Sequence, residues 1–333
     1  MRIVTKGPRV EDMPNPSEYI AQVSDLTSLE VYYYPDGTED KVLREISFDM
    51  RRGDIWGIVG SEAFEIELLL EIIGSVRPYG SGRCVLAERG MMRKKRRILP
   101  HVFFISDGDV TFPNMNTLEY LMFATANARL SAAERQAEIL QRLLDTQLYY
   151  LALVPIRYLS RAQKAVISLL AASFTKALLI IFSVTQLAFD KRLSKGIRGI
   201  ADILSQRGSA LLIGSRDCDM VQETCTHTAF LTEGKFRDKG SMDDMLARLD
   251  KRIYVVACKA PQTLSEKLKS LDPGLNSVVF GDELHIYDYR EPPISQTDFL
   301  ELIRQTGEPI ESLQTSNKTL ANAYREVLSN HDL

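Results

Sequence analysis

Residues 53–76 read GDIWGIVGSEAFEIELLLEIIGSV, and this stretch decides the fold class. Its first part, residues 53–60, is a short apolar run bounded by glycines, as expected for a strand that is buried on both faces. In residues 64–76 the apolar side chains recur at helical spacing. A buried strand, a short loop and a helix in this order predict one βα unit of a parallel sheet.

The flanking sequence extends this pattern into a complete domain. Two alternating apolar segments, residues 29–34 and 42–50, are separated by turn residues and predict an antiparallel start. Further along, the periodicity predicts strands at 101–106, 177–184 and 209–214, and helices at 117–129, 131–145, 160–176 and 191–206. The helices at 117–129 and 131–145 form an insert. Strands that alternate with helices predict a three-layer α/β domain.

The C-terminal part follows another order. The periodicity there predicts strand 252–258, helix 262–271, strands 276–281 and 283–289, helix 296–307, strand 309–315 and a last helix at 319–329. This β-α-β-β-α-β order is ferredoxin-like. A chain of 333 residues also exceeds what one ordinary core supports. We therefore expect an irregular N-terminal arm (1–25), an α/β domain (26–250) and a small α+β domain (251–333).

Composition limits the partners. With 41 basic and 44 acidic side chains the net charge is -3, which gives no global signal for nucleic acid. The four cysteines lack metal-ligand spacing, so we expect no metal site and a reducing compartment. The most apolar stretch, residues 165–182, is interrupted by polar residues and predicts a buried helix and strand, not a membrane span. Any link to a membrane is therefore expected to pass through another protein.

The loop after the buried strand stands where many nucleotide-binding proteins carry G-x-x-x-x-G-K-[ST]. In that register Gly60 is the first glycine, but Glu65, Ile66 and Glu67 replace the second glycine, the lysine and the hydroxyl residue. The changes remove close backbone approach, a positive charge and a Mg²⁺ ligand. Glu62 adds a further carboxylate, and each like-charge pair at ~4 Å costs on the order of a few kcal/mol. We expect weak or no ATP binding in the usual pose.

Two more patterns follow in chain order. Residues 159–163 read LSRAQ at a helix start, and the apolar strand near 180 ends in IIFSVTQLAFD, residues 180–190. With these patterns, residues 29–239 resemble the nucleotide-binding subunit of ABC transporters, which carries L-S-G-G-Q and an apolar run followed by D-E-P-T-x-G-L-D. The domain behind them is similar to the accessory C-terminal domain of drug-exporter ATPases in that family. The resemblance implies an ABC cassette of the P-loop NTPase class.

The resemblance also assigns positions residue by residue. Retained positions are Ser160, Gln163 and Asp190. Ser183 stands at the Mg²⁺-orienting aspartate, Val184 at the carboxylate that activates water and Arg216 at the switch histidine. A valine cannot accept a proton.

Two weaker positions complete the motif set. Asp107 replaces the glutamine after the edge strand. Tyr34 corresponds to the aromatic that stacks on adenine, with Tyr32 and Tyr33 as competitors. In the family both positions belong to the subunit's own nucleotide site.

In the family two subunits face head to tail, and each ATP lies between the phosphate loop of one and the signature motif of the other. This chain has lost the residues of its own site, whereas much of the surface that it contributes to a neighbour is kept. We expect no catalytic residue in this chain and a heterodimer with a competent ABC ATPase, with ATP and Mg²⁺ at the partner's site. A transmembrane permease completes the predicted complex, which is most similar to an exporter. The chain would then be cytoplasmic, at the inner face of the cell membrane.

The surface offers two further features, each with a plainer interpretation. Aromatic and Met-rich residues open the helical insert, where the family's cassettes form a groove for a short helix of the permease; half of them are equally suited to the core. These residues are Phe112, Met115, Leu118, Tyr120 and Met122. A basic run at 93–97 fits phospholipid headgroups or nucleic acid, but a solvated loop is the commoner case.

Two other functions are compatible with these residues. One is a working ATPase whose nucleotide is held by contacts outside the usual motifs, although no second G-x-x-x-x-G-K-[ST] occurs in the chain. The other is a soluble regulator that uses the cassette as a protein-binding scaffold. ATP affinity of the isolated protein and the identity of its co-purifying partners discriminate between these functions.

Overall fold

The computed structural model describes residues 19–86, 89–90, 99–106, 112–127, 130–247, 252–288, 290, 292–316 and 319–329. The chain divides into two compact units, Met1–Ser241 and Met242–Leu333. The boundary precedes the one predicted near residue 250. The reason is that helix α8 (Met242–Ala247) contacts the last helix of the second unit, α11 (Leu320–Ser329).

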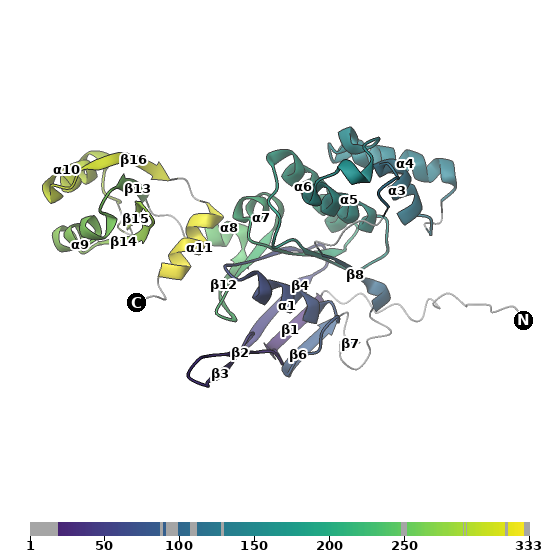
Figure 1. Ribbon diagram of the computed structural model, residues 1–333, viewed down its shortest axis with the longest axis horizontal. Helices are drawn as coiled ribbons and strands as arrows, with labels where there is room; N and C mark the ends of the chain where they lie inside the picture. The colour runs from purple at the N-terminus through teal and green to yellow at the C-terminus, as the bar shows by residue number, and fades with distance from the viewer. Residues whose placement is uncertain are drawn as a thin grey trace, which may run out of the picture. The chain divides into compact units, whose positions relative to one another are not determined.

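The first unit is built on a six-stranded sheet with the order β12-β11-β5-β10-β9-β8. Figure 1 labels its two edge strands, β12 and β8. The strands are β5 (Ile55–Gly60), β8 (Val102–Ile105), β9 (Leu179–Ser183), β10 (Ala210–Ser215), β11 (His227–Thr232) and β12 (Lys235–Ser241). All pairs are parallel except β11 with β12. Every residue of β5, β9 and β10 is buried, which explains their continuous apolar sequences. The predicted parallel core is confirmed.

Helices cover both faces of this sheet. On one face α1 (Ala63–Ile73) contacts β5, β9 and β10. The other face carries α5 (Arg161–Ala172), α6 (Lys191–Gln206) and α7 (Cys218–Thr224). Side chains alternate along a strand, and accordingly a Cβ on Gly214 would meet α1 whereas one on Gly57 would meet α7.

A second sheet, antiparallel and ordered β4-β1-β6-β7, packs over α1. Its strands are β1 (Tyr19–Thr27), β4 (Ile46–Arg51), β6 (Ser81–Leu86) and β7 (Arg89–Gly90), and a separate hairpin joins β2 (Val31–Tyr33) to β3 (Glu39–Lys41). Residues 19–25 were predicted as part of an irregular arm, and that prediction is wrong for them. They form most of a strand because β1 pairs on both edges, with β4 and with β6.

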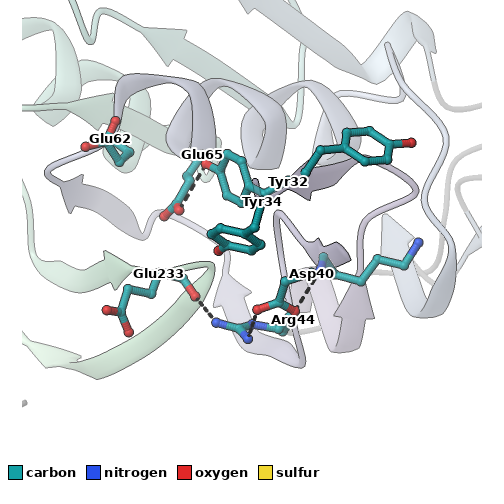
Figure 2. A pocket seen from close by; sticks show the side chains of 9 residues that line it. Tyr32, Tyr34, Asp40, Arg44, Glu62, Glu65 and Glu233 are labelled. Atoms are coloured by element: carbon teal, nitrogen blue, oxygen red, sulfur yellow. Dashed lines mark hydrogen bonds and ion pairs between the residues drawn. The ribbon is translucent and has the colours of Figure 1, made fainter. Parts of the chain in front are cut away.

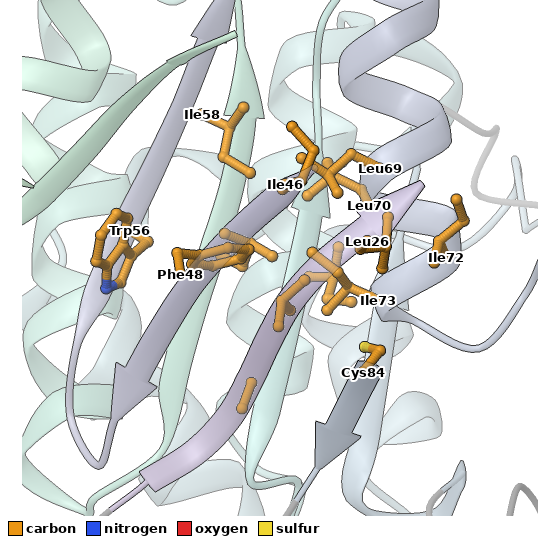
Figure 3. Close-up of a cluster of buried hydrophobic side chains, with 14 of the residues drawn as sticks. Leu26, Ile46, Phe48, Trp56, Ile58, Leu69, Leu70, Ile72, Ile73 and Cys84 are labelled. Atoms are coloured by element: carbon orange, nitrogen blue, oxygen red, sulfur yellow. The ribbon is translucent and has the colours of Figure 1, made fainter. Parts of the chain in front are cut away.

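The main core lies between the two sheets and α1 (Figure 3). Leu69 and Leu70 of α1 and Ile46 of β4 are fully buried there, and Trp56 of β5 packs against Phe48 with ring centroids 5.4 Å apart. Burying side chains of this size contributes roughly 1.5–3 kcal/mol each. This packing fixes α1, and therefore the loop before it, against the sheet.

The predicted helical insert is present as α3 (Thr117–Ala124) and α4 (Ala132–Asp145). Helix α4 begins with a reciprocal capping box between Ser131 and Glu134. In the part of the chain that the structure describes, no helix has the length and apolar character needed to cross a membrane.

The second unit has the predicted ferredoxin-like order. Its strands are β13 (Arg252–Cys258), β14 (Leu275–Phe280), β15 (Glu283–Asp288) and β16 (Ile310–Ser316), with α9 (Pro261–Leu271) and α10 (Gln296–Thr306) between them. The sheet is antiparallel with the order β14-β15-β13-β16. Its core is its own, centred on Tyr254 and Phe299, whose rings stack 3.9 Å apart.

Candidate functional site

The predicted site residues of the central sheet gather at one of its edges. Because β5, β9 and β10 are parallel neighbours, their carboxyl ends meet at the same edge. Gly60, Ser183 and Ser215 are the last residues of these strands. The loops that follow them carry the positions assigned to phosphate, Mg²⁺ and water.

The turn from β5 into α1 is tightly enclosed at its first residue. A Cβ on Gly60 would lie 2.5 Å from the backbone oxygen of Leu231 on the neighbouring strand β11. Any larger residue would displace that strand, so this glycine has a structural reason to be present. Glu62 precedes α1 at the N-cap position without a side-chain capping bond, and it is exposed.

Glu65, in the first turn of α1, is only 2% exposed although it is a carboxylate. One of its oxygens accepts a hydrogen bond from the Gly234 backbone N–H at 3.0 Å, and the other accepts one from the Tyr32 hydroxyl at 3.2 Å. Figure 2 shows this side chain turned toward Tyr32 on β2. A single carboxylate thus joins α1, the β2–β3 hairpin and the β11–β12 turn.

The electrostatics follow from this burial. Removal from water raises the pKa of Glu65, and the hydrogen bonds from Gly234 and Tyr32 only partly oppose the increase. Burial, followed by the nearby Glu65 charge, raises the pKa of Tyr32 to about 12. The Tyr32 hydroxyl therefore keeps its proton and donates a hydrogen bond to the carboxylate.

The next two positions of the loop are also occupied within the protein. Ile66 is fully buried, and its methyl groups fill the space beside Gly214. Glu67 accepts a short hydrogen bond from the hydroxyl of Thr185, which is 3% exposed and lies just beyond β9. The side chains at the lysine and hydroxyl positions therefore face the apolar core and the end of β9.

A cavity of about 350 Å³ opens beside Glu65 (Figure 2). Its walls are Tyr32, Tyr33, Tyr34, Asp40, Lys41, Arg44, Glu62, Glu65 and Glu233. The two basic residues are already engaged: Arg44 binds Asp40 and the Glu233 carbonyl, and Lys41 binds the Leu29 carbonyl. Carboxylates outnumber cations on these walls.

Three tyrosines were candidates for the adenine-stacking position, and they differ in the structure. Tyr34 lines the cavity and is 47% exposed, whereas Tyr33 is 76% exposed. Tyr32 is half-buried and is engaged by Glu65. Tyr34 therefore keeps a partly open ring, and its assignment stays a prediction.

The positions that the resemblance assigns to the Mg²⁺-orienting and water-activating residues lie together at the end of β9. Ser183 is 5% exposed and Val184 is fully buried, with its backbone N–H donating to the Gly214 carbonyl at 2.9 Å. Arg216, at the switch position after β10, is exposed. Chemically, Val184 and Arg216 offer neither a carboxylate nor an imidazole here.

The retained positions begin two helices of the first unit. Ser160 caps α5, and it forms a reciprocal capping box with Gln163, with bonds of 2.9 and 3.1 Å. Asp190 caps α6 by accepting a hydrogen bond from the Leu193 N–H at 2.8 Å. Ser160 and Asp190 are both exposed.

Several residues of the site were not anticipated. Gly234 donates the backbone N–H to Glu65 from a turn in which Glu233 and Gly234 both have positive φ. Thr185 and Asp217 tie loops of the sheet edge together. The Glu-Gly pair between two alternating segments was a recognisable hairpin signal, whereas nothing local in the sequence indicates the Glu67–Thr185 contact.

Some predicted positions lie outside the described residues. These are Asp107, the basic run 93–97 and residues 1–18 of the N-terminal arm. Within the described residues no cluster of three or more His, Cys, Asp or Glu side chains could hold a metal ion.

Comparison with solved structures identifies the fold of the first unit. The chain superposes on cbiO1 from Clostridium perfringens, part of an ABC transporter complex, with a TM-score of 0.57 and 19% identity, covering 69% of this chain and 92% of that one. A nucleotide-free ATP-binding cassette from an ABC transporter gives a TM-score of 0.52 at 17% identity, covering 67% and 91%. The first unit has the fold of an ATP-binding cassette.

Sequence relatives of this cassette carry matching names. A Geobacter sulfurreducens protein, provisionally named an ABC transporter ATP-binding protein, is 26% identical over 255 residues, which is 73% of this chain and 98% of the relative. An energy-coupling factor transporter ATP-binding protein of Clostridium perfringens is 22% identical over 238 residues, covering 69% and 80%. No family model matches the chain. The chain thus resembles ABC transporter ATP-binding subunits in sequence and in fold.

Proposed function

We propose that this chain is a catalytically impaired ATP-binding-cassette subunit of a membrane ABC transporter. In this proposal it pairs with a competent ATPase subunit, and its own site binds ATP weakly or not at all. The observation that carries the proposal is the buried Glu65 carboxylate at the start of α1, held by Gly234 and Tyr32. An anion of the chain itself occupies the turn where a phosphate would need donors.

The interaction energies at the start of α1 disfavour a bound phosphate. Hydrogen bonds to a charged group contribute about 1.5–3 kcal/mol each, and Glu65 accepts two of them. The attraction between a helix N-terminus and an anion is about 0.3–1 kcal/mol at an exposed site. A phosphate would have to take these two donors from Glu65 or lie beside the Glu65 and Glu62 carboxylates.

Ile66 and Glu67, which stand at the lysine and hydroxyl positions of the phosphate-loop pattern, support the same proposal. The buried Ile66 cannot reach or neutralise a phosphate, and the carboxylate of Glu67 is bound by Thr185. The site lacks a base as well, because Val184 is apolar and buried. We derive no hydrolytic step at this chain's own site.

We propose that the exposed helix starts carrying Ser160, Gln163 and Asp190 complete the ATP site of the partner, with ATP and Mg²⁺ held mainly by that partner. Arg161 and Ala162 alter this surface relative to the family's two glycines. The pattern of losses favours this role, because what is missing belongs to the own site and what is kept belongs to the contributed surface.

The helical insert is the proposed contact with a transmembrane permease. Phe112 packs on Phe123 with ring centroids 4.8 Å apart, and Phe123 is 54% exposed. Leu144 and Leu153, 53% and 74% exposed, extend the apolar surface of the insert. Such surface suits an amphipathic helix of a partner. The chain would then sit at the cytoplasmic face of the membrane, bound only through its partner.

We propose export as the direction of transport, on the basis of the ferredoxin-like domain behind the cassette. A relative from Haemophilus influenzae, 25% identical over 201 residues and matched over 56% of its length, is named for import of Fe(3+) ions. Transport assays on the assembled complex decide between the two directions.

ATP binding and turnover test the proposal. The purified chain alone should show no turnover above background and no submillimolar ATP affinity, whereas its addition to an intact cassette subunit should raise turnover. The triple variant Glu65→Gly, Ile66→Lys, Glu67→Ser restores the phosphate-loop pattern and serves as the positive control for binding. Robust turnover by the wild-type chain alone would refute the proposal and favour a working ATPase.

A further inference from the structure

Asp217, the residue after the switch position, connects two loops at the sheet edge. One of its carboxylate oxygens accepts a hydrogen bond from the Met220 N–H at 3.0 Å and so caps α7. The other accepts one from the backbone N–H of Phe189 at 3.2 Å. Its own N–H donates to the hydroxyl of Ser215 at 3.1 Å. The carboxylate thus bridges the start of α7 and the loop that leads into α6.

The bridged loop, residues 184–190, connects β9 to α6. Val184 at its start is fixed by a backbone bond to Gly214, and Asp190 at its end is fixed as the cap of α6. Between them the Phe189 ring packs near the Phe182 ring, with centroids 6.3 Å apart, and this contact restrains the side chain without a directed bond to the main chain. The bond to Asp217 is therefore the directed restraint on the residue immediately before Asp190.

We infer that Asp217 is a positioning residue: it holds the main chain at Phe189, the part of the loop 184–190 next to Asp190, and so helps to set the place at which Asp190 is presented to the partner's ATP site. This inference rests on the proposed function only for its consequence, the turnover of the partner. Its first part concerns the chain alone. The physical reason is that a charge-assisted bond to a backbone N–H fixes the main chain, whereas Asp190 itself is exposed.

Two variants separate positioning from folding. Asparagine is as good an N-cap as aspartate, so Asp217→Asn keeps the bond to Met220. Its amide has only one acceptor oxygen, and it therefore loses the bond to Phe189. Asp219→Ala removes an exposed carboxylate two residues further along the same helix and is the matched control.

Amide hydrogen exchange on the purified chain is the first measurement. In Asp217→Asn the Phe189 amide should exchange on the order of tenfold faster, while the amides of α7 keep their protection. The thermal midpoint should fall by no more than about 2–4 °C, since one hydrogen bond is lost, and Asp219→Ala should match wild type throughout. Unchanged exchange at Phe189 would overturn the inference.

Turnover of the complex with an intact cassette subunit is the second measurement. Asp217→Asn should lower kcat on the order of tenfold and leave KM for ATP unchanged, because the partner's own loop binds the ground-state nucleotide. A wild-type kcat in this variant would also overturn the inference. Failure of the wild-type chain to stimulate the intact cassette would instead refute the proposed function, and the exchange result would still decide the role of Asp217.

Discussion

Glu65 is a buried carboxylate that accepts hydrogen bonds from two remote parts of the chain. Replacing it with alanine leaves the buried N–H of Gly234 without an acceptor, so Glu65→Ala should lower the free energy of unfolding by about 1–3 kcal/mol. Glu62→Ala, an exposed neighbour without a capping bond, should change it by less than about 0.5 kcal/mol. Urea unfolding measures both. Equal effects of the two variants would contradict the buried, bonded state of Glu65.

The same variant should also change the pH dependence of stability. Burial raises the pKa of Glu65 above its ordinary value of 4.5, so between these two values the folded state binds more protons than the unfolded state. The contribution of Glu65 to stability is therefore complete below pH 4.5 and declines as the pH rises through its raised pKa. The difference in unfolding free energy between wild type and Glu65→Ala should accordingly be larger at acid pH than at neutral pH.

At the level of elements, two helices with the same kind of capping box allow the structural role of Ser160 to be distinguished from its proposed functional role. Ser131 caps α4 and Ser160 caps α5 with the same reciprocal geometry. Either serine replaced by alanine should cost about 1 kcal/mol of stability. Only Ser160→Ala should also lower the turnover of a partner cassette, because in the proposed complex only α5 contributes its start to the partner's ATP site. Thermal unfolding and coupled ATPase assays check the pair, and equal turnover of the two variants would argue against the contributed surface.

At the level of the whole molecule, the separate cores predict separate unfolding. Phe299 is fully buried against Tyr254 in the second unit, and Phe299→Ala should cost that unit about 3–5 kcal/mol. Trp56, the chain's single tryptophan, lies in the first unit and reports on it by fluorescence. The variant should lower the midpoint temperature of one calorimetric unfolding transition, that of the second unit. The midpoint temperature followed by Trp56 fluorescence should stay unchanged. A shift of both together would show that the two units unfold cooperatively.

Local pattern was sufficient for much of the architecture. The periodicity predicted α6 with the bounds found, and Pro261 at the start of α9 displaced the predicted start by only one residue. β1 was missed because its strand character depends on pairing with β4 and β6 on both sides. β11 and β12 were left unassigned, although their hairpin turn is marked by Glu233 and Gly234.

The sequence by itself determined the βα order of the first unit, the ferredoxin-like order of the second and the absence, after β5, of the second glycine, the lysine and the hydroxyl residue of the pattern G-x-x-x-x-G-K-[ST]. Only the tertiary structure decided what replaces them: a buried carboxylate bonded to Tyr32, 33 residues away, and to Gly234, 169 residues away. Periodicity and capping act over a few residues, and at those separations they carry no information about contacts. The close approach arises from packing α1 between two sheets, which brings remote donors to one anion.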